Sequence, residues 1–417
     1  METATKPPAA GFDRRQVYRP FLERLNPIAS LSDVANRNLI MPREHDPRDL
    51  GEPPIHVSLA NTAELTRGIQ MAVVGGIGSG KTSELLLTQR LLLRHADAVN
   101  ILVDLADYTD LSDLNAGAIL ATAGIRLYPI VKKAGKASPE VASAYTKLRE
   151  LALGKTVFIP EDEWELDYDE EAKAIRFEVR GLMRLRFPEL EHQVARLKEL
   201  LLTIASPFLG ADAQITLLVD GLDRLIRAER FREFAEQDLQ ALRGTNITVI
   251  IVAPLLLWYD KSRFLQDHFD LVKHIPAAAA GPRDVTFLRK ILDRRGALEL
   301  MDPAEVATIA KYSGGVLRDL LTLARSAAEY AYRDDEDRIG RDHVRAAVKQ
   351  LGNRYLVGLG KTHKMRLRRL AEKDEFPIDD PTARELLVNR QVLEYFDRGR
   401  EFFRVHPALS KILPKPA

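Results

Sequence analysis

The feature that most constrains this chain is a glycine-rich run between two apolar segments, "MAVVGGIGSGKTSELLL", which begins at residue 71. It fits the spacing Gly-x-x-x-x-Gly-Lys-Thr. The apolar Met71–Val74 predicts a buried strand, and the leucines of Ser83–Leu93 fall on one side of a predicted helix. A glycine-rich turn between a strand and a helix N-terminus points backbone N–H groups at a bound phosphate. The segment therefore predicts a phosphate-binding loop.

Each residue type in this loop has a chemical task at a phosphate. Lys81 supplies a positive charge for the β and γ phosphates, and Thr82 supplies a hydroxyl for Mg²⁺. The remaining loop residues expected to bind the nucleotide are Gly75, Gly76, Gly78, Ser79 and Gly80. A glycine-rich turn without a ligand is the alternative, and the agreement of strand, loop, Lys-Thr and helix argues against it.

Further apolar runs predict more buried strands beside this one. They are residues 99–104, 215–220, 247–253 and 271–276. Each follows a helical stretch, and this alternation is typical of an α/β fold with a parallel sheet. Ligands of open α/β sheets bind at the carboxyl ends of the strands, where Asp220 ends "ITLLVD". Asp220 is therefore the expected magnesium ligand, with capping of the following helix as the alternative.

The residue after Asp220 bears on whether a nucleotide would be cleaved. Cleavage needs a group that orients or deprotonates water. The usual group is a glutamate directly after the aspartate, but position 221 is glycine. Asp223 is the nearby acid that could stand in, and it is a catalytic candidate together with Lys81. An exposed helix N-cap is the other interpretation of Asp223.

From about residue 277 the pattern changes to helices only. Helical patterns cover residues 282–296, 302–334 and 339–351, and the second is broken at Ser313-Gly314-Gly315. Arg318 falls in the first helical turn after this break, where its guanidinium could reach a γ-phosphate. A surface arginine that pairs with Asp319 or Asp335 is the alternative.

Together these pieces resemble the AAA+ and STAND-type P-loop ATPases. The matching motifs are GGIGSGKT, LLVDGLD, VIIVAP and GGVLRDLL, within roughly residues 55–350. The resemblance implies ATP and Mg²⁺ as cofactors, hydrolysis of ATP to ADP and phosphate, and contact of Arg318 with the γ-phosphate. The DGLD form is more similar to STAND and NACHT-type switch ATPases than to motors, which carry Asp-Glu.

The region after the fourth strand departs from the family pattern in one place and offers a candidate in another. The family has a polar residue at the end of this strand, where this chain has Ala253-Pro254. Slow turnover is therefore expected. An arginine finger from a neighbouring subunit would lie between the fourth and fifth strands, and Arg263 in "YDKSRFLQDHF" is the candidate. A solvated helix residue is the alternative for Arg263.

An insertion at about 132–210 is longer than a crossover helix requires. Its pattern predicts a helix over 138–153, a β-hairpin turning at Asp169–Lys173, which Leu182–Phe187 could extend, and a long amphipathic helix over 188–209. We expect a surface for homo-oligomer assembly or for a partner protein. A passive elaboration packed on the core is the alternative.

The last segment, residues 351–417, resembles a winged-helix domain, as in origin-recognition-type initiators. A basic helix is predicted over 361–373, a short helix over 380–387 and a hairpin turning at 397–400. The segment has 14 lysines and arginines and 9 acids, which favours contact with DNA phosphates. A helix-turn-helix reader needs two helices where only one short helix fits. A packing and autoinhibition element, as in STAND switches, is the alternative.

Composition limits the remaining classes. The chain has no cysteine, which excludes disulfides and thiolate chemistry, and its net charge of +1 confines any nucleic-acid contact to a local patch. No apolar run approaches the roughly 18 residues of a membrane span, so a cytoplasmic protein with no membrane partner is expected. The expected domains are an N-terminal extension (1–54), a P-loop core (55–276), a helical lid (277–350) and the winged-helix-like domain (351–417).

Three functions follow from these observations. The leading hypothesis is an ATP-dependent conformational switch, in which slow hydrolysis resets an assembly or partner-binding state. The second is a DNA-engaged, initiator-like or loader-like AAA+ ATPase. The third is a non-hydrolysing, nucleotide-stabilised component of a multi-protein system, for example a defence system.

Overall fold

The computed structural model describes residues 13–26, 38–44, 51–94, 98–108, 111, 114–153, 164–169, 174–179, 191–209, 214–225, 228–278, 282–397 and 399–413. Their contacts divide the chain into two units. Unit 2 comprises Pro53–Gly75 and Lys81–Ile275, and unit 1 comprises Met1–Glu52, Gly76–Gly80 and Pro276–Ala417. Across the described ranges, no helix combines the length and the apolar character needed to cross a bilayer.

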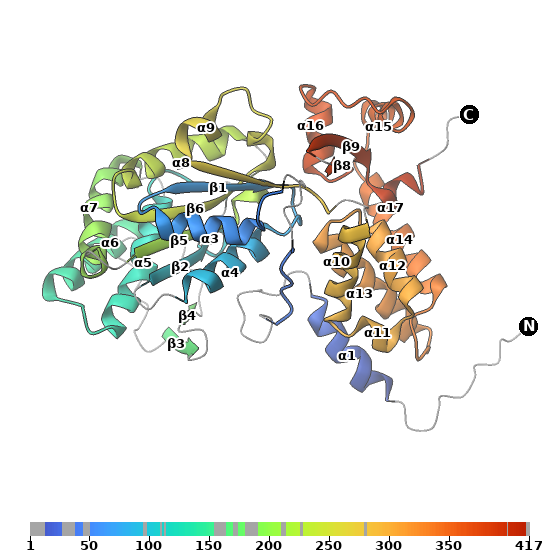
Figure 1. The fold of residues 1–417 in the computed structure, drawn as a ribbon, viewed down its shortest axis with the longest axis horizontal. Coiled ribbons are helices and arrows are strands. Elements are labelled where there is room, and N and C mark those ends of the chain that lie inside the picture. The colour runs from blue at the N-terminus through green and yellow to red at the C-terminus, as the bar shows by residue number, and fades with distance from the viewer. Residues whose placement is uncertain are drawn as a thin grey trace, which may run out of the picture. The chain divides into compact units, whose positions relative to one another are not determined.

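A five-stranded parallel sheet forms the centre of unit 2, with strand order β2-β5-β6-β1-β7 (Figure 1). The strands are β1 (Gln70–Gly75), β2 (Ala98–Asp104), β5 (Gln214–Asp220), β6 (Ile247–Ala253) and β7 (Leu271–Ile275). The predicted α/β fold with a parallel sheet is confirmed, and each predicted strand end agrees within one residue. The pairing sets Asp104 directly beside Asp220, at the carboxyl ends of β2 and β5.

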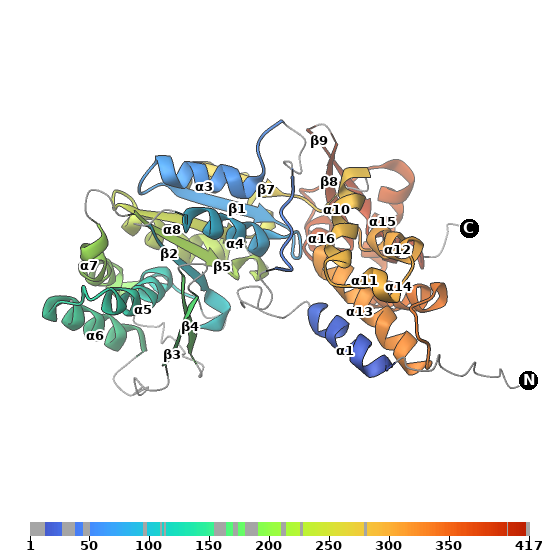
Figure 2. The ribbon, with the colours of Figure 1, turned by 60° about the horizontal axis from the view of Figure 1, so that its bottom comes forward.

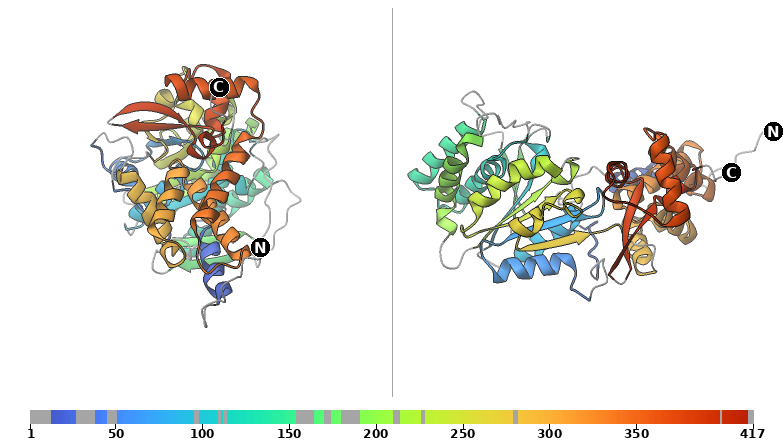
Figure 3. Two further views of the ribbon diagram at one scale, coloured as in Figure 1. Left: turned by 90° about the vertical axis from the view of Figure 1, so that its right-hand side faces the viewer. Right: turned by 90° about the horizontal axis from the view of Figure 1, so that it is seen from above.

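Helices cover both faces of this sheet. The helices α3 (Ile55–Leu65) and α4 (Lys81–Leu92) pack on one face, where Leu59 and Leu85 join Met71 of β1 in a fully buried core. Figure 3 (right) shows α3, in blue, and α8 (Ala228–Leu242), in yellow-green, on opposite sides of the strands. Both faces of the parallel sheet are therefore buried, which explains why its strands are almost entirely apolar.

A buried carboxylate ties α8 to α5 (Ala118–Lys133). Asp238 of α8 accepts hydrogen bonds from the backbone N–H groups of Gly117 at 2.5 Å and Ile119 at 2.8 Å. These N–H groups belong to the N-terminal end of α5 and have no partner inside that helix. Asp238 thus serves as a cap supplied by another helix, although the sequence offers no capping residue at Gly117 itself.

The insertion contains the predicted helix, hairpin and helix. They are α6 (Pro139–Leu153), the antiparallel strands β3 (Trp164–Asp169) and β4 (Ala174–Val179), and α7 (Val194–Ala205). Figure 2 shows α5, α6 and α7 together at one end of the sheet, and Tyr128 of α5 stacks on Tyr145 of α6 with ring centroids 3.9 Å apart.

The second helix of the insertion is shorter than the predicted 188–209. Residues 191–193 and 206–208 form 3-10 turns instead, and Pro207 lacks the N–H that would continue an α-helix. The hairpin turn after Asp169 and the predicted extension at 182–187 lie outside the described residues.

Unit 1 is built mainly from helices. They are α1 (Arg14–Arg24), α10 (Pro282–Asp293), α11 (Ala297–Leu300), α12 (Pro303–Tyr312), α13 (Leu317–Arg333) and α14 (Arg341–Leu356). The predicted break between α12 and α13 at Ser313–Gly315 is present. The sequence analysis did not predict α1, whose Tyr18 and Phe21 are buried in the same core as the helices from α10 to α14.

The helices and strands predicted between residues 361 and 405 are present. The end of the chain comprises α15 (Lys361–Lys373), α16 (Pro381–Val388), the antiparallel hairpin of β8 (Val392–Asp397) and β9 (Arg400–Val405), and α17 (Pro407–Ser410). We refer to residues 361–413 as the C-terminal module. Its Leu367, Leu386 and Val392 are buried in one core with residues of α13 and α14. The one short helix α16 separates α15 from the hairpin, as the sequence indicates.

Candidate phosphate-binding site

The glycine-rich loop connects β1 to α4 as the motif requires. The helix α4 begins at Lys81, and Gly78 and Gly80 before it have φ values of 83° and 109°. Only glycine adopts such angles without strain, so these positions turn the backbone tightly ahead of the helix N-terminus. The buried Ser79 Oγ has no hydrogen-bond partner among the described residues. A loop of this shape with an unsatisfied buried hydroxyl fits a bound phosphate.

Lys81 is held inside the loop by two oxygen atoms. Its Nζ donates to the carbonyl oxygen of Gly75 at 2.9 Å and lies 2.9 Å from Asp223 Oδ2. The Lys81 side chain is 2% exposed and that of Asp223 is 15% exposed, so little water screens this ion pair. Asp223, in the 3-10 turn Leu222–Arg224, therefore lies directly beside the motif lysine.

The two residues expected to hold magnesium lie against each other. Thr82 Oγ1 donates to Asp220 Oδ2 at 2.6 Å. The pKa of Asp220 is raised to about 6, because burial and the nearby carboxylates of Asp223 and Asp104 outweigh the opposing hydrogen bond from Thr82. A buried carboxylate beside a threonine hydroxyl is a suitable ligand set for Mg²⁺, which prefers oxygen and compensates negative charge.

The glycine at position 221 has a structural reason. Gly221 has a φ of 89°, and a Cβ atom there would overlap Oδ1 of Asp104. A glutamate at this position would meet both the backbone strain and the Asp104 carboxylate. The site therefore excludes a side chain at the place where an Asp-Glu motif would put its glutamate.

Asp104 is a site residue that the sequence analysis missed. Its Oδ1 accepts a hydrogen bond from Ala106 N at 3.0 Å, and burial raises its pKa above the ordinary value. A signal for it exists in the sequence, because "LVD" ends both residues 102–104 and residues 218–220. Two parallel strands with the same ending place their aspartates side by side when they pair in register.

Arg43 is a second missed residue, within unit 1. Its Nη2 donates to the carbonyl oxygen of Ser79 at 3.3 Å, and its guanidinium lies over the ring of Phe287 at 5.3 Å. The residue is 5% exposed. It lies far from the loop in sequence and in a segment without a motif, so no pattern could have indicated it.

Arg318 lies beside the phosphate loop, also within unit 1. A Cβ at Gly78 would be 3.0 Å from Arg318 Cβ, and the preceding Leu317 N donates to Gly78 O at 2.8 Å. The partners considered for a surface arginine are engaged elsewhere, because Asp319 pairs with Arg390 at 3.0 Å and Asp335 pairs with Arg14 at 2.9 Å.

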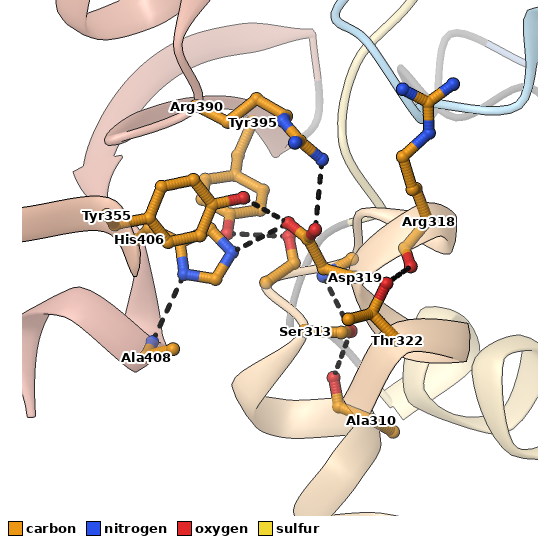
Figure 4. A network of polar contacts seen from close by, with 12 residues as sticks. Ala310, Ser313, Arg318, Asp319, Thr322, Tyr355, Arg390, Tyr395, His406 and Ala408 are labelled. Carbon is orange, nitrogen blue, oxygen red and sulfur yellow. Dashed lines mark hydrogen bonds and ion pairs between the residues drawn. The ribbon is translucent and has the colours of Figure 1, made fainter. Parts of the chain in front are cut away.

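Asp319, next to Arg318, is the centre of a buried polar network (Figure 4). Its carboxylate accepts from Tyr355 Oη at 2.5 Å and Arg390 Nη1 at 3.0 Å, and it lies 3.3 Å from His406 Nε2. Burial alone would raise the pKa of Asp319, but the hydrogen bond from His406 and the charge of Arg390 hold it below the ordinary value. Asp319 is therefore an ionised buried acid with three partners.

The three remaining residues of interest, Arg263, Ala253 and Pro254, lie in unit 2. Arg263 is exposed and precedes α9 (Phe264–His268) with a φ of 57°. Ala253 and Pro254 at the end of β6 are buried, so this strand end presents apolar atoms.

No protein-family model and no curated protein sequence matches this chain. Solved structures match it by fold. The Aeropyrum pernix ORC2 protein in its ADPNP–ADP complexes is 16% identical, with 89% of this chain and 94% of that chain covered and a TM-score of 0.44. The Drosophila ORC bound to DNA is 14% identical, with 99% and 94% covered and a TM-score of 0.43.

A third similar structure is the Thermotoga maritima RuvB Holliday junction branch migration motor. It is 14% identical, with 76% of this chain and 75% of that chain covered and a TM-score of 0.36.

Proposed function

We propose that this protein is an ATP-binding conformational switch that cleaves ATP slowly and so controls assembly or a partner. One observation carries the proposal: a phosphate-loop lysine, a threonine hydroxyl and two aspartates meet at the carboxyl ends of β1 and β5. Lys81 pairs with Asp223, and Thr82 donates to Asp220. These residue types at these positions are suited to a nucleoside triphosphate with its magnesium ion.

The residues would divide the work as follows. The loop Gly75–Gly80 would donate backbone N–H groups to the phosphates, and Lys81 would exchange its contact with Asp223 for contact with the β and γ phosphates. Thr82 and Asp220 would hold Mg²⁺, which when bound neutralises charge on the phosphate oxygens. Asp223, released by Lys81, would orient the attacking water and accept its proton.

Slow cleavage is proposed because two usual contributors are replaced by groups without side-chain polarity. Gly221 cannot carry a carboxylate, and Ala253 offers only a methyl group. Asp223 remains as the acid proposed to act on water. Arg318 is proposed as the γ-phosphate contact and Arg263 as a finger toward a neighbouring copy, and both roles come from the family resemblance.

A steady-state ATPase measurement on the full chain, paired with limited proteolysis, tests this function. We expect low turnover that Lys81→Ala abolishes, and a protease pattern that differs between ADP and a slowly hydrolysed ATP analogue. Absence of turnover together with an unchanged protease pattern would contradict the switch. Tight nucleotide binding without cleavage would instead support the third function, a nucleotide-stabilised component.

A DNA-engaged ATPase is the second candidate, and exposed cations on α15 favour it. Lys361, Lys364 and Arg368 are exposed and have no acidic partner within the described part of the chain, whereas Arg366 and Arg369 pair with Asp380 and Glu375. DNA binding through these cations should weaken steeply as salt rises.

The test of DNA binding uses a triple variant in which Lys361, Lys364 and Arg368 become alanine. We expect it to lose duplex binding at low salt while its ATP binding is unchanged. No detectable binding by the parent protein at low salt would remove this candidate.

The insertion is the proposed assembly or partner surface, either for further copies of this chain or for another protein. Sedimentation of a variant with a charge reversal on α7, at the exposed Glu199, would test it. An unchanged association state and unchanged partner binding would leave the insertion as a packed elaboration.

A further inference from the structure

The phosphate loop contacts the first turn of α13. Leu317 N donates to the carbonyl oxygen of Gly78 at 2.8 Å. A Cβ at Gly78 would lie 2.8 Å from Val316 Cγ1 and 3.0 Å from Arg318 Cβ. The first N–H groups of a helix have no partner within it, and here one of them is satisfied by the loop. A change in the backbone of this loop would therefore displace the residues around Arg318.

The C-terminal module contacts the turn that leads into α13. Tyr395 Oη donates to the carbonyl oxygen of Gly314 at 2.9 Å, and a Cβ at Gly314 would lie 2.9 Å from Pro407 Cδ. Gly314 has a φ of 61°. The turn before α13 thus fits closely under β8 and the start of α17, and it has no room to shift while they stay in place.

The Asp319 carboxylate links α13 to the C-terminal module through polar contacts. The residue is 3% exposed, and its three polar partners come from different elements: Tyr355 from α14, Arg390 from the residues after α16, and His406 from the residue before α17. A buried carboxylate is stable only while its partners surround it. Movement of the C-terminal module away from α13 would remove Arg390 and His406 and leave the buried carboxylate with Tyr355 alone, so the module and the first turn of α13 should move together.

The geometry of the helix separates Asp319 from Arg318. Consecutive residues of an α-helix point about 100° apart, and Figure 4 shows the Arg318 guanidinium extending away from the Asp319 network. Asp319 can therefore fix the backbone that carries Arg318 without occupying the guanidinium.

We infer that Asp319 is a positioning residue. Through it the C-terminal module fixes the position of Arg318, and this position determines the affinity for the γ-phosphate. The inference rests on the proposed function and deepens it, because it names the contact that transmits the nucleotide state. ATP would favour the arrangement in which Asp319 keeps Arg390 and His406. Coupling between two sites is reciprocal. A partner that displaced the module would therefore weaken ATP binding by the same factor by which ATP weakens binding of that partner.

The test is a double-mutant cycle on the full chain between Arg390 and Arg318. Binding of fluorescent ADP and of a slowly hydrolysed fluorescent ATP analogue is titrated for the parent, Arg390→Gln, Arg318→Ala and the double variant. Arg390→Lys keeps the charge and serves as the conservative variant. Arg404→Gln removes another arginine of the same module, which pairs with the exposed Asp374, and is the matched control.

We expect Arg390→Gln to weaken binding of the ATP analogue about 3- to 10-fold and to change ADP binding less than about 2-fold. Arg390→Lys should restore most of the loss, Arg404→Gln should have no effect, and Arg390→Gln should add nothing once Arg318 is alanine. A purely structural role predicts otherwise, because general loosening would weaken both nucleotides and would persist without Arg318.

The inference is overturned if Arg390→Gln has no effect, or if its effect is equal for both nucleotides or unchanged in the Arg318→Ala background. These results leave the proposed function intact provided that the parent binds the analogue and Lys81→Ala does not. If the parent binds neither nucleotide, both the proposed function and the inference are wrong.

Discussion

Lys81 Nζ and Asp223 Oδ2 lie 2.9 Å apart, so the lysine of the phosphate loop is held by an acid from the turn after β5. Asp223 thereby occupies the neighbourhood in which Lys81 would meet the terminal phosphates. Under the proposed function, this pair would place a carboxylate beside the γ-phosphate without the usual glutamate. Asp223 would then be the residue that separates cleavage from binding.

We predict that Asp223→Asn lowers the ATPase rate about 10- to 100-fold without lowering ATP affinity. The amide cannot accept a proton from water, and Lys81 loses a competitor for the phosphates. Single-turnover hydrolysis and equilibrium titration measure the two effects separately. Asp260→Asn removes an acid that pairs with Arg232 at 2.9 Å in the same unit, and it should leave both unchanged. An Asp223→Asn rate equal to that of the parent would exclude Asp223 from catalysis.

Gly221→Ala should destabilise the protein by about 1–3 kcal/mol, since the position has a left-handed φ and an added Cβ would overlap Asp104 Oδ1. Gly244→Ala is the control for backbone strain alone, because Gly244 has a φ of 75° and open space around it. Denaturant unfolding of both variants gives the comparison. Asp104→Ala in the Gly221→Ala background should recover the part of the loss that exceeds the Gly244→Ala loss, and no recovery would contradict the overlap.

The affinity for Mg²⁺ should depend on pH through Asp220, whose pKa is raised to about 6 by burial. Magnesium binds the ionised carboxylate, so protons compete with it. The Mg²⁺-dependent part of nucleotide binding should be constant above about pH 7 and fall about tenfold per pH unit well below 6. Titrations with and without Mg²⁺ between pH 5 and 8 measure this. Asp220→Asn should abolish the dependence, and a pH profile that survives in this variant would assign it to another group.

The Asp319 network should stabilise the fold in a pH-dependent way. The folded-state pKa of Asp319 lies below the ordinary value of 3.8. Its contribution is therefore present above the unfolded-state pKa and is lost as the pH falls through the folded-state pKa. Asp319→Asn should cost about 3–5 kcal/mol at pH 7, since it leaves the half-buried Arg390 without its counter-charge.

Thermal unfolding of the parent and Asp319→Asn at several pH values checks this contribution. The difference in unfolding free energy should be the same at pH 7 and pH 5 and should shrink below about pH 4. A difference that grew as the pH fell would mean that Asp319 is protonated in the folded state.

The central sheet and the loop could be predicted because their signals are local. The apolar runs mark strands buried on both faces, and the Gly-Lys-Thr spacing marks the turn into α4. The antiparallel strand pairs β3-β4 and β8-β9 could also be predicted, because the alternation of apolar and polar residues lies within each strand's own sequence.

The rest of the site depends on contacts between distant residues. Nothing near Arg43 in sequence indicates Ser79 as its partner, and nothing near Asp319 indicates Arg390 or His406. Asp104 lies between these cases, since its strand was predicted but its proximity to Gly221 follows only from the strand order β2-β5. The helix α1 was missed because its short amphipathic pattern, with Pro20 inside it, gives a weak periodic signal.

The measurement that tests the central claim most directly is the mass and sedimentation coefficient of the full chain, determined without nucleotide, with ADP and with a slowly hydrolysed ATP analogue. We expect the analogue to shift the sedimentation coefficient or the association state relative to ADP, and Lys81→Ala to show no shift. Identical values in all three states, in protein shown by titration to be saturated with the analogue, would contradict a nucleotide-driven switch.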